Sequence, residues 1–169
     1  MLLQSARDLI RHTILLAGLL FAAACSTPGP VATGHAPSTA SRATQKPADT
    51  HGGRVAEIAM SQVGVPYRYG GASTNGFDCS GLVHYSYAKA GKAVPRTTAG
   101  LWQSARPVSY AELQTGDVLF FRIEGKMSHV GVYVGAGRFV HAPASGRQVS
   151  VESLDSDFYS LAFIRGGRL

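Results

Sequence analysis

A cysteine at the expected start of a helix is the first residue whose surroundings suggest chemistry. Within Phe77-Asp78-Cys79-Ser80-Gly81 a glycine-rich loop gives way to apolar residues at helical spacing, and Asp78 is a natural helix N-cap. Cys79 then lies in the first turn, near the positive end of the helix dipole, where a thiolate is stabilised and its pKa falls. The pattern indicates a nucleophile, although a buried structural cysteine or a disulfide with Cys25 would produce the same sequence.

Two histidines are spaced so that they could serve this thiol. The alternation from His129 to Val134 predicts a strand, and Arg138–Ala142 predicts its hairpin partner across a three-residue loop. This register places His129 and His141 on one face, about 7–8 Å apart as diagonal neighbours, with Gly131 leaving open space between them. His129 would accept the thiol proton and His141 would orient its ring. A two-residue loop would instead put the two rings on opposite faces.

Other interpretations of these residues stay open at this point. Each histidine taken singly could be an ordinary core or surface residue. Two histidines and a cysteine could also bind zinc, but Cys79 is fifty residues from His129 and on a helix, so we expect no metal and no other cofactor. The remaining histidines have no comparable setting: His12, His35, His51 and His84.

The elements that must position these groups follow from periodicity. Helical spacing predicts helices over Gly53–Val63, from Cys79 to a stop at Gly91, and over Thr98–Ser104. Later segments read as strands: Val118–Arg122, residues 130–134, Arg138–Ala142, Gln148–Val151 and Ser160–Arg165. Helices followed by strands with short connections predict an α+β domain built on an antiparallel sheet.

The N-terminal residues have the features of a targeting segment rather than of the folded domain. Residues 1–25 hold basic residues, an apolar run over Thr13–Ala24 and small residues before Cys25, as in a secretory signal. Ala22-Ala23-Ala24-Cys25 resembles a bacterial lipobox, with Ala22 where Leu is preferred, so we expect Cys25 to be lipidated. Ordinary cleavage after an A-x-A pattern, which would release a soluble protein, remains the alternative. Ser26 after the cysteine favours the outer membrane by resemblance to lipoprotein sorting.

Composition divides the rest of the chain into a tether and one domain. Residues 26–52 hold four of the eight prolines and many small polar residues, which predicts a disordered tether, and residues 53–169 are expected to form one compact domain. The hydrophobic fraction of 45% argues against a fully disordered chain. The net charge of +6 is dispersed, without a basic cluster, so nucleic acid is not an expected partner.

Five motifs occur in an order that carries a resemblance. They are PYRYGG from Pro66, FDCSGLV from Phe77, TGDVLFF from Thr115, HVGVYVG from His129 and FVHA from Phe139. Over about residues 54–167 the chain resembles the NlpC and p-sixty cell-wall cysteine peptidases. The resemblance implies a papain-like core, with N-terminal helices packed on an antiparallel sheet of about five or six strands. Thr115 stands where the family usually has Pro.

The resemblance also implies roles for individual residues. Cys79 would be the nucleophile, His129 the base and His141 the third, orienting member. Tyr67 matches the tyrosine of the glycine-rich loop that lies beside the nucleophile and helps the oxyanion site; plain packing is its alternative role.

Three further positions match residues of the family. Asp78 and Ser80 match residues that line the pocket for the free amine of the substrate. Arg96 matches a family arginine to which we assign no role.

The implied activity is hydrolysis of amide bonds in peptidoglycan stem peptides or cross-links. The chain would be a cysteine-type murein endopeptidase, monomeric and held by a lipid anchor at the periplasmic face of the outer membrane. An amidase or acyltransferase acting on another acyl substrate is a second possibility. A non-catalytic wall-binding lipoprotein is a third, but such a protein has no need for Cys79, His129 and His141 together.

Overall fold

The structure, a computed structural model, describes residues 50–169. The expected signal segment, Cys25 and nearly all of the tether therefore lie outside the described residues. The first helix, α1 (His51–Met60), begins two residues before the expected Gly53 because Thr50 caps it, accepting a hydrogen bond from the Gly53 N–H at 3.0 Å. It ends at Met60 rather than Val63, and a turn leads to Gly64, whose φ is +93°.

The other two N-terminal helices follow the sequence closely. Helix α2 (Cys79–Lys89) starts after the cap Asp78, whose carboxylate accepts from the Gly81 N–H at 2.6 Å. Helix α3 (Thr98–Ser104) has the expected bounds. Between α1 and α2, the short strands β1 (Ala72–Ser73) and β2 (Gly76–Phe77) pair within the glycine-rich loop.

In the described part of the chain, six strands form the expected antiparallel sheet, in the order β3-β8-β4-β5-β6-β7. Their bounds are β3 (Arg106–Val108), β4 (Val118–Ile123), β5 (Lys126–Gly135), β6 (Arg138–His141), β7 (Ser150–Ser153) and β8 (Phe163–Arg168). A 3-10 turn, η2 (Tyr110–Glu112), follows β3. The α+β prediction is confirmed, although β3 was not expected from the sequence.

The predicted strand over Ser160–Arg165 is wrong in its first half. Helix α4 (Asp157–Ala162) occupies that stretch, because the Ser156 hydroxyl accepts from the Tyr159 N–H at 3.4 Å and starts a helical turn. Strand β8 begins only at Phe163.

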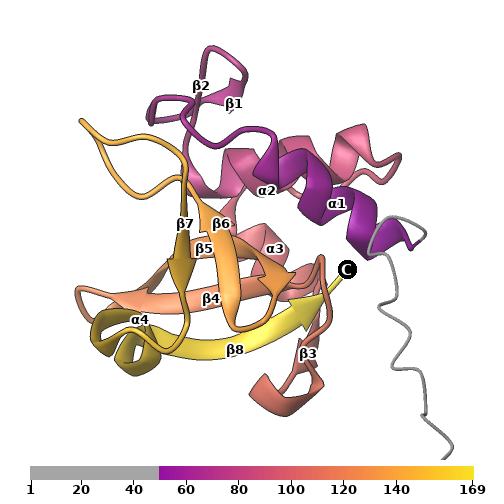
Figure 1. The fold of residues 1–169 in the computed structure, drawn as a ribbon, viewed down its shortest axis with the longest axis vertical. Coiled ribbons are helices and arrows are strands. Elements are labelled where there is room, and N and C mark those ends of the chain that lie inside the picture. Colours follow the sequence, from indigo (N-terminus) through magenta and orange to yellow (C-terminus); the bar gives the residue numbers. More distant parts are fainter. Residues whose placement is uncertain (1–49) are drawn as a thin grey trace, which may run out of the picture. The chain divides into compact units, whose positions relative to one another are not determined.

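The sheet separates two apolar layers (Figure 1). Helices α1, α2 and α3 cover one face, where Val118, Phe120, Val130, Val132 and Val140 lie within the main core. On the other face the second cluster consists of Leu119, Phe121, Phe139, Leu154 and Ala162, the last contributed by α4.

The β5–β6 hairpin reaches the expected register by a different route. Val132 pairs with Val140 and Tyr133 with Phe139, but Gly135 pairs with Arg138 across a two-residue turn. Ala136 in that turn has φ +52° and Gly137 +67°, the left-handed conformation of a type I′ turn. A register shift between Tyr133 and Gly135 adds the odd residue as a bulge, so the two-residue turn does not reverse the faces.

The space above Gly131 is filled rather than open. A Cβ at Gly131 would lie 2.6 Å from the Phe139 ring and 2.9 Å from the Val140 carbonyl oxygen. The glycine is therefore needed for the close approach of Phe139, whose ring centroid lies 5.1 Å from that of His141.

Candidate active site

The Cys79 thiol lies between the start of α2 and strand β5. Its sulfur donates a hydrogen bond to the Ser128 carbonyl at 3.9 Å and lies 4.0 Å from the Thr98 hydroxyl. The Val130 N–H also bonds to the sulfur. The backbone groups on both sides of His129 thus hold the free thiol of Cys79 against β5.

The two histidines meet as the strand register predicts. His129 Nε2 and His141 Nδ1 are 2.8 Å apart, and the rings are nearly perpendicular, at 84°. His141 Nε2 lies 3.4 Å from the Ser150 hydroxyl on β7. Within residues 50–169, His129 Nδ1 has no hydrogen-bond partner, and this nitrogen is therefore available to accept a proton.

Burial sets the protonation state of this pair. His129 and His141 are almost wholly buried, and burial lowers the pKa of His129 to about 4. The pKa of His141 falls to about 3, through burial first and then through His129 and the charge of Arg147. Both rings are therefore neutral at pH 7, which a proton acceptor requires.

The expectation of a lowered thiol pKa is wrong for the free protein. Burial raises the pKa of Cys79, and the negative Asp78 raises it further. Bonds from the Val130 and Ser80 N–H groups lower it by less. The resting site of the free protein therefore holds a protonated thiol and a neutral imidazole.

The same burial makes stability depend on pH. An unfolded histidine binds a proton below about 6.5, whereas folded His129 does so only below about 4. We expect the contribution of neutral His129 to the free energy of unfolding to be fully present above pH 6.5. It should fall by about 3 kcal/mol between pH 6.5 and 4 on account of His129 alone. Urea unfolding across this range measures the effect, and His129→Gln should make the decline less steep by removing the part that His129 contributes. A wild-type curve that is already flat from pH 7 to 4 contradicts the buried neutral pair.

Asp78 and Ser80 lie beside Cys79, within a cluster closed by Arg96. The Arg96 guanidinium donates to both carboxylate oxygens of Asp78, at 2.9 and 2.8 Å, and to the Ser80 hydroxyl at 3.0 Å. Burial raises the pKa of Asp78, but the bonds from Arg96 and the Gly81 N–H outweigh it and leave that pKa lowered. The cluster therefore carries little net charge, and Arg96 acquires a positioning role that the sequence did not reveal.

Backbone pairing brings Tyr67 to the same place. Tyr67 forms a parallel bridge with Phe77, two residues before Cys79. Its pKa is raised by burial and then by the negative charges that Cys79 and Asp78 can carry. The glycine-rich loop lies directly against the start of α2. The approach is so close that a Cβ at Gly81 would collide with the Gly71 carbonyl oxygen.

Two neighbours of Cys79 and the histidine pair were not predicted from the sequence, Thr98 and Ser150. Thr98 begins α3, and only the packing of α3 on α2 brings its hydroxyl to the sulfur. Ser150 depends on the β6–β7 register, in which it pairs with His141. Neither residue has a local sequence signal.

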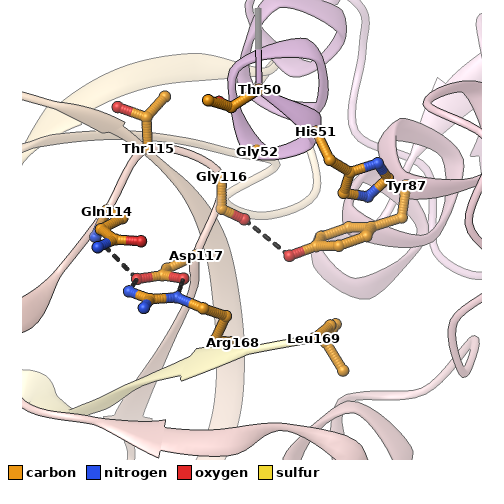
Figure 2. A pocket seen from close by; sticks show the side chains of 10 residues that line it. All are labelled: Thr50, His51, Gly52, Tyr87, Gln114, Thr115, Gly116, Asp117, Arg168 and Leu169. Atoms are coloured by element: carbon orange, nitrogen blue, oxygen red, sulfur yellow. Dashed lines mark hydrogen bonds and ion pairs between the residues drawn. The ribbon is translucent and has the colours of Figure 1, made fainter.

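A large cavity lies away from these residues (Figure 2). It has a volume of about 640 Å³ and is lined by Thr50, His51, Gly52, Tyr87, Gln114, Thr115, Gly116, Asp117, Arg168 and Leu169. Its polar groups bond to one another: Arg168 pairs with Asp117 at 2.7 Å, and the Tyr87 hydroxyl donates to the Gly116 carbonyl at 2.8 Å. Tyr87 is eight residues beyond Cys79 on α2, about 12 Å along the helix. This cavity therefore does not belong to the reacting groups.

The described residues show neither a metal site nor a membrane-spanning helix. No group of three or more His, Cys, Asp or Glu side chains in residues 50–169 is arranged to hold a metal ion. Within the same residues, no helix combines the length and apolar character needed to span a membrane.

Comparison with known proteins finds close sequence relatives. The chain is 41% identical over 116 residues to murein DD-endopeptidase MepH of Escherichia coli, covering 65% of this chain and 43% of that protein. It is 35% identical over 100 residues to a gamma-D-glutamyl-L-lysine dipeptidyl-peptidase of Bacillus subtilis, covering 57% of this chain and 34% of the relative. The chain thus spans less than half the length of these two curated relatives.

Solved structures agree with the fold. An NlpC/P60 family protein from Bacillus cereus superposes with a TM-score of 0.66 at 30% identity, covering 69% of this chain and 39% of that one. The NlpC/p60 domain of the peptidoglycan hydrolase SagA superposes with a TM-score of 0.62 at 29% identity, covering 70% and 98%. The profile of the NlpC/P60 family matches residues 64–168, which include the nucleophile candidate and both histidines. The chain therefore belongs to the NlpC/P60 family and has its papain-like fold.

Proposed function

We propose that this protein is a peptidoglycan endopeptidase that hydrolyses amide bonds by a cysteine mechanism. The observation that carries the proposal is the 2.8 Å contact between His129, on the strand β5 that holds the Cys79 sulfur, and His141 on the neighbouring strand β6. A thiol, a neutral base and a group orienting that base are what acyl transfer needs. The names of the relatives, a murein endopeptidase and a peptidase for γ-glutamyl bonds, support peptidoglycan peptides as the substrate.

The reaction follows from the positions of these groups. His129 Nδ1 accepts the proton as the Cys79 sulfur attacks the amide carbon, while the bond to His141 fixes which ring nitrogen is free. The backbone N–H groups at the start of α2 and the Tyr67 hydroxyl stabilise the oxyanion. The amine leaves with the proton from His129, and water then hydrolyses the thioester.

Substrate binding involves the Asp78 cluster. Asp78 and Ser80 receive the free amine of the substrate, and Arg96 holds the Asp78 carboxylate in place for it. Because Arg96 already neutralises Asp78, we expect this subsite to orient an amine by hydrogen bonding more than by net charge.

A lipid anchor at Cys25 and a place at the periplasmic face of the outer membrane complete the proposal. The signal-like residues 1–25 and the lipobox-like sequence before Cys25 support it. In this arrangement the monomeric domain reaches the wall from the membrane. Labelled palmitate should enter the wild-type protein and not a Cys25→Ala variant; equal labelling of both contradicts the anchor.

Muropeptide profiling tests the enzymatic proposal. Purified peptidoglycan incubated with the full chain should yield fragments with new amine and carboxyl ends, and the fragment masses identify the bond. The matched control is Cys79→Ala, which should leave the profile unchanged. Identical profiles with and without wild-type protein contradict hydrolysis and favour the wall-binding alternative, and release of a non-peptide acyl group favours the amidase alternative.

A further inference from the structure

A second cavity, distinct from the one in Figure 2, adjoins the proposed catalytic groups. It has a volume of about 620 Å³, and we call it the Arg147 pocket; its lining residues are Pro66, Tyr67, Gly146, Arg147, Gln148 and Ser150. Ser150 lies 3.4 Å from His141 Nε2. The pKa of Tyr67 is raised by burial and then by the negative charge that Cys79 can carry, so the Tyr67 hydroxyl lies near the Cys79 sulfur. The pocket therefore touches both the histidine pair and the surroundings of the nucleophile.

Backbone hydrogen bonds fix the walls of the Arg147 pocket. The Tyr67 N–H donates to the Arg147 carbonyl at 2.8 Å, and Pro66 forms an antiparallel bridge with Gln148. Just behind, Val149 exchanges bonds with the glycine-rich segment, donating to the Val65 carbonyl at 2.8 Å. The segment that carries Arg147 is thus tied to the loop that carries Tyr67, and the pocket is formed before any ligand binds.

The pocket holds one positive charge that the described part of the protein leaves uncompensated. Arg147 is exposed, and the ion pairs among residues 50–169 are Arg96–Asp78 and Arg168–Asp117. No Asp or Glu lines the pocket. Burial and His129 lower the pKa of His141 most, and the charge of Arg147 lowers it further. Arg147 is therefore close enough to act on the His141 ring.

We propose that Arg147 binds a free carboxylate of the peptide substrate, and so makes the protein selective for peptides with a carboxylate near the scissile bond. This inference rests on the proposed function and specifies its substrate. A guanidinium presents paired N–H donors that match the two oxygens of a carboxylate. A γ-linked glutamyl residue leaves its α-carboxyl group free, so a peptide of that kind supplies the required charge. The neutralised Asp78–Arg96 cluster cannot supply this selection.

Binding to a protein that cannot turn over its substrate tests the proposal. Calorimetry on the full chain carrying Cys79→Ala compares a muropeptide with free carboxyl groups against the same muropeptide with those groups converted to carboxamides. We expect the carboxamide to bind about tenfold more weakly, the scale of a charge-assisted hydrogen bond. Adding Arg147→Gln should remove the difference, and Arg147→Lys should keep part of it. Arg54→Gln, at an exposed position on α1, is the control for lost charge and should keep all of it.

The outcomes separate this inference from the proposed function. Equal affinity for the two muropeptides, no measurable binding of either, or undiminished discrimination after Arg147→Gln overturns the role of Arg147. Hydrolysis by the wild-type protein is judged separately, by the peptidoglycan digest. A protein that cleaves muropeptides without discriminating carboxylate from carboxamide thus retains the proposed function and loses only the inference about Arg147.

Discussion

Replacing Cys79 by Ser should lower kcat/KM for peptidoglycan peptides by about 10⁴-fold or more, the scale seen when a nucleophile is removed. The hydroxyl is similar in shape to the thiol but much harder to deprotonate. The site offers it only a neutral imidazole, because burial lowers the pKa of His129 to about 4. Steady-state hydrolysis of a defined muropeptide measures the loss.

The fold should survive this substitution, so that the loss is chemical. The contacts of the sulfur with Ser128 and Thr98 are long, at 3.9 and 4.0 Å, and the start of α2 is capped by Asp78 rather than by Cys79. Thermal unfolding of the variant should match that of the wild type. The matched control is Thr98→Ser, which keeps the neighbouring hydroxyl and should keep the activity. A Cys79→Ser enzyme within tenfold of wild type would falsify the assignment of the nucleophile.

Replacing His129 by Ala should lower kcat/KM by about 10³-fold, within the range of general acid–base catalysis. The variant leaves the thiol with a pKa that burial has raised and with no base to take its proton. His141→Gln should cost less, because its amide can still bond to His129 Nε2 and hold the ring. Comparing the three enzymes on one substrate measures the effect.

The pH profile of the wild-type enzyme adds a check on the base. His129 must be neutral to act, and its pKa is about 4, so kcat/KM should persist at pH 5.5 and fall as the pH drops toward 4. Circular dichroism at each pH separates this decline from unfolding. An acid limb centred near 6.5, or a His129→Ala enzyme with wild-type kcat/KM, contradicts the role of the buried imidazole.

The sequence predicted the features that short-range rules control. An Asx N-cap followed by apolar residues at helical spacing defined the start of α2 at Cys79, and strand alternation defined the shared face of His129 and His141. The family resemblance added the papain-like class. These predictions hold because each depends on a few neighbouring residues.

What the sequence did not predict depends on contacts between distant segments. The Arg96–Asp78 pair joins residues 18 apart through the packing of a loop, and the sequence around Arg96 does not predict it. The predicted hairpin turn was too long by one residue, but the predicted register was right. A bulge near Val134 keeps His129 and His141 on the same face despite the shorter turn. The thiol pKa was predicted in the wrong direction, because burial, which raises it, depends on the tertiary fold.

Alkylation of Cys79 tests the central claim most directly. The full chain is treated with increasing iodoacetamide, the fraction of Cys79 modified is measured by peptide mass spectrometry, and muropeptide hydrolysis is assayed on the same samples. If the sulfur forms the acyl-enzyme, residual activity should fall in proportion to the unmodified fraction and reach zero when Cys79 is fully modified. Activity that persists in protein whose Cys79 is fully carbamidomethylated contradicts the cysteine mechanism.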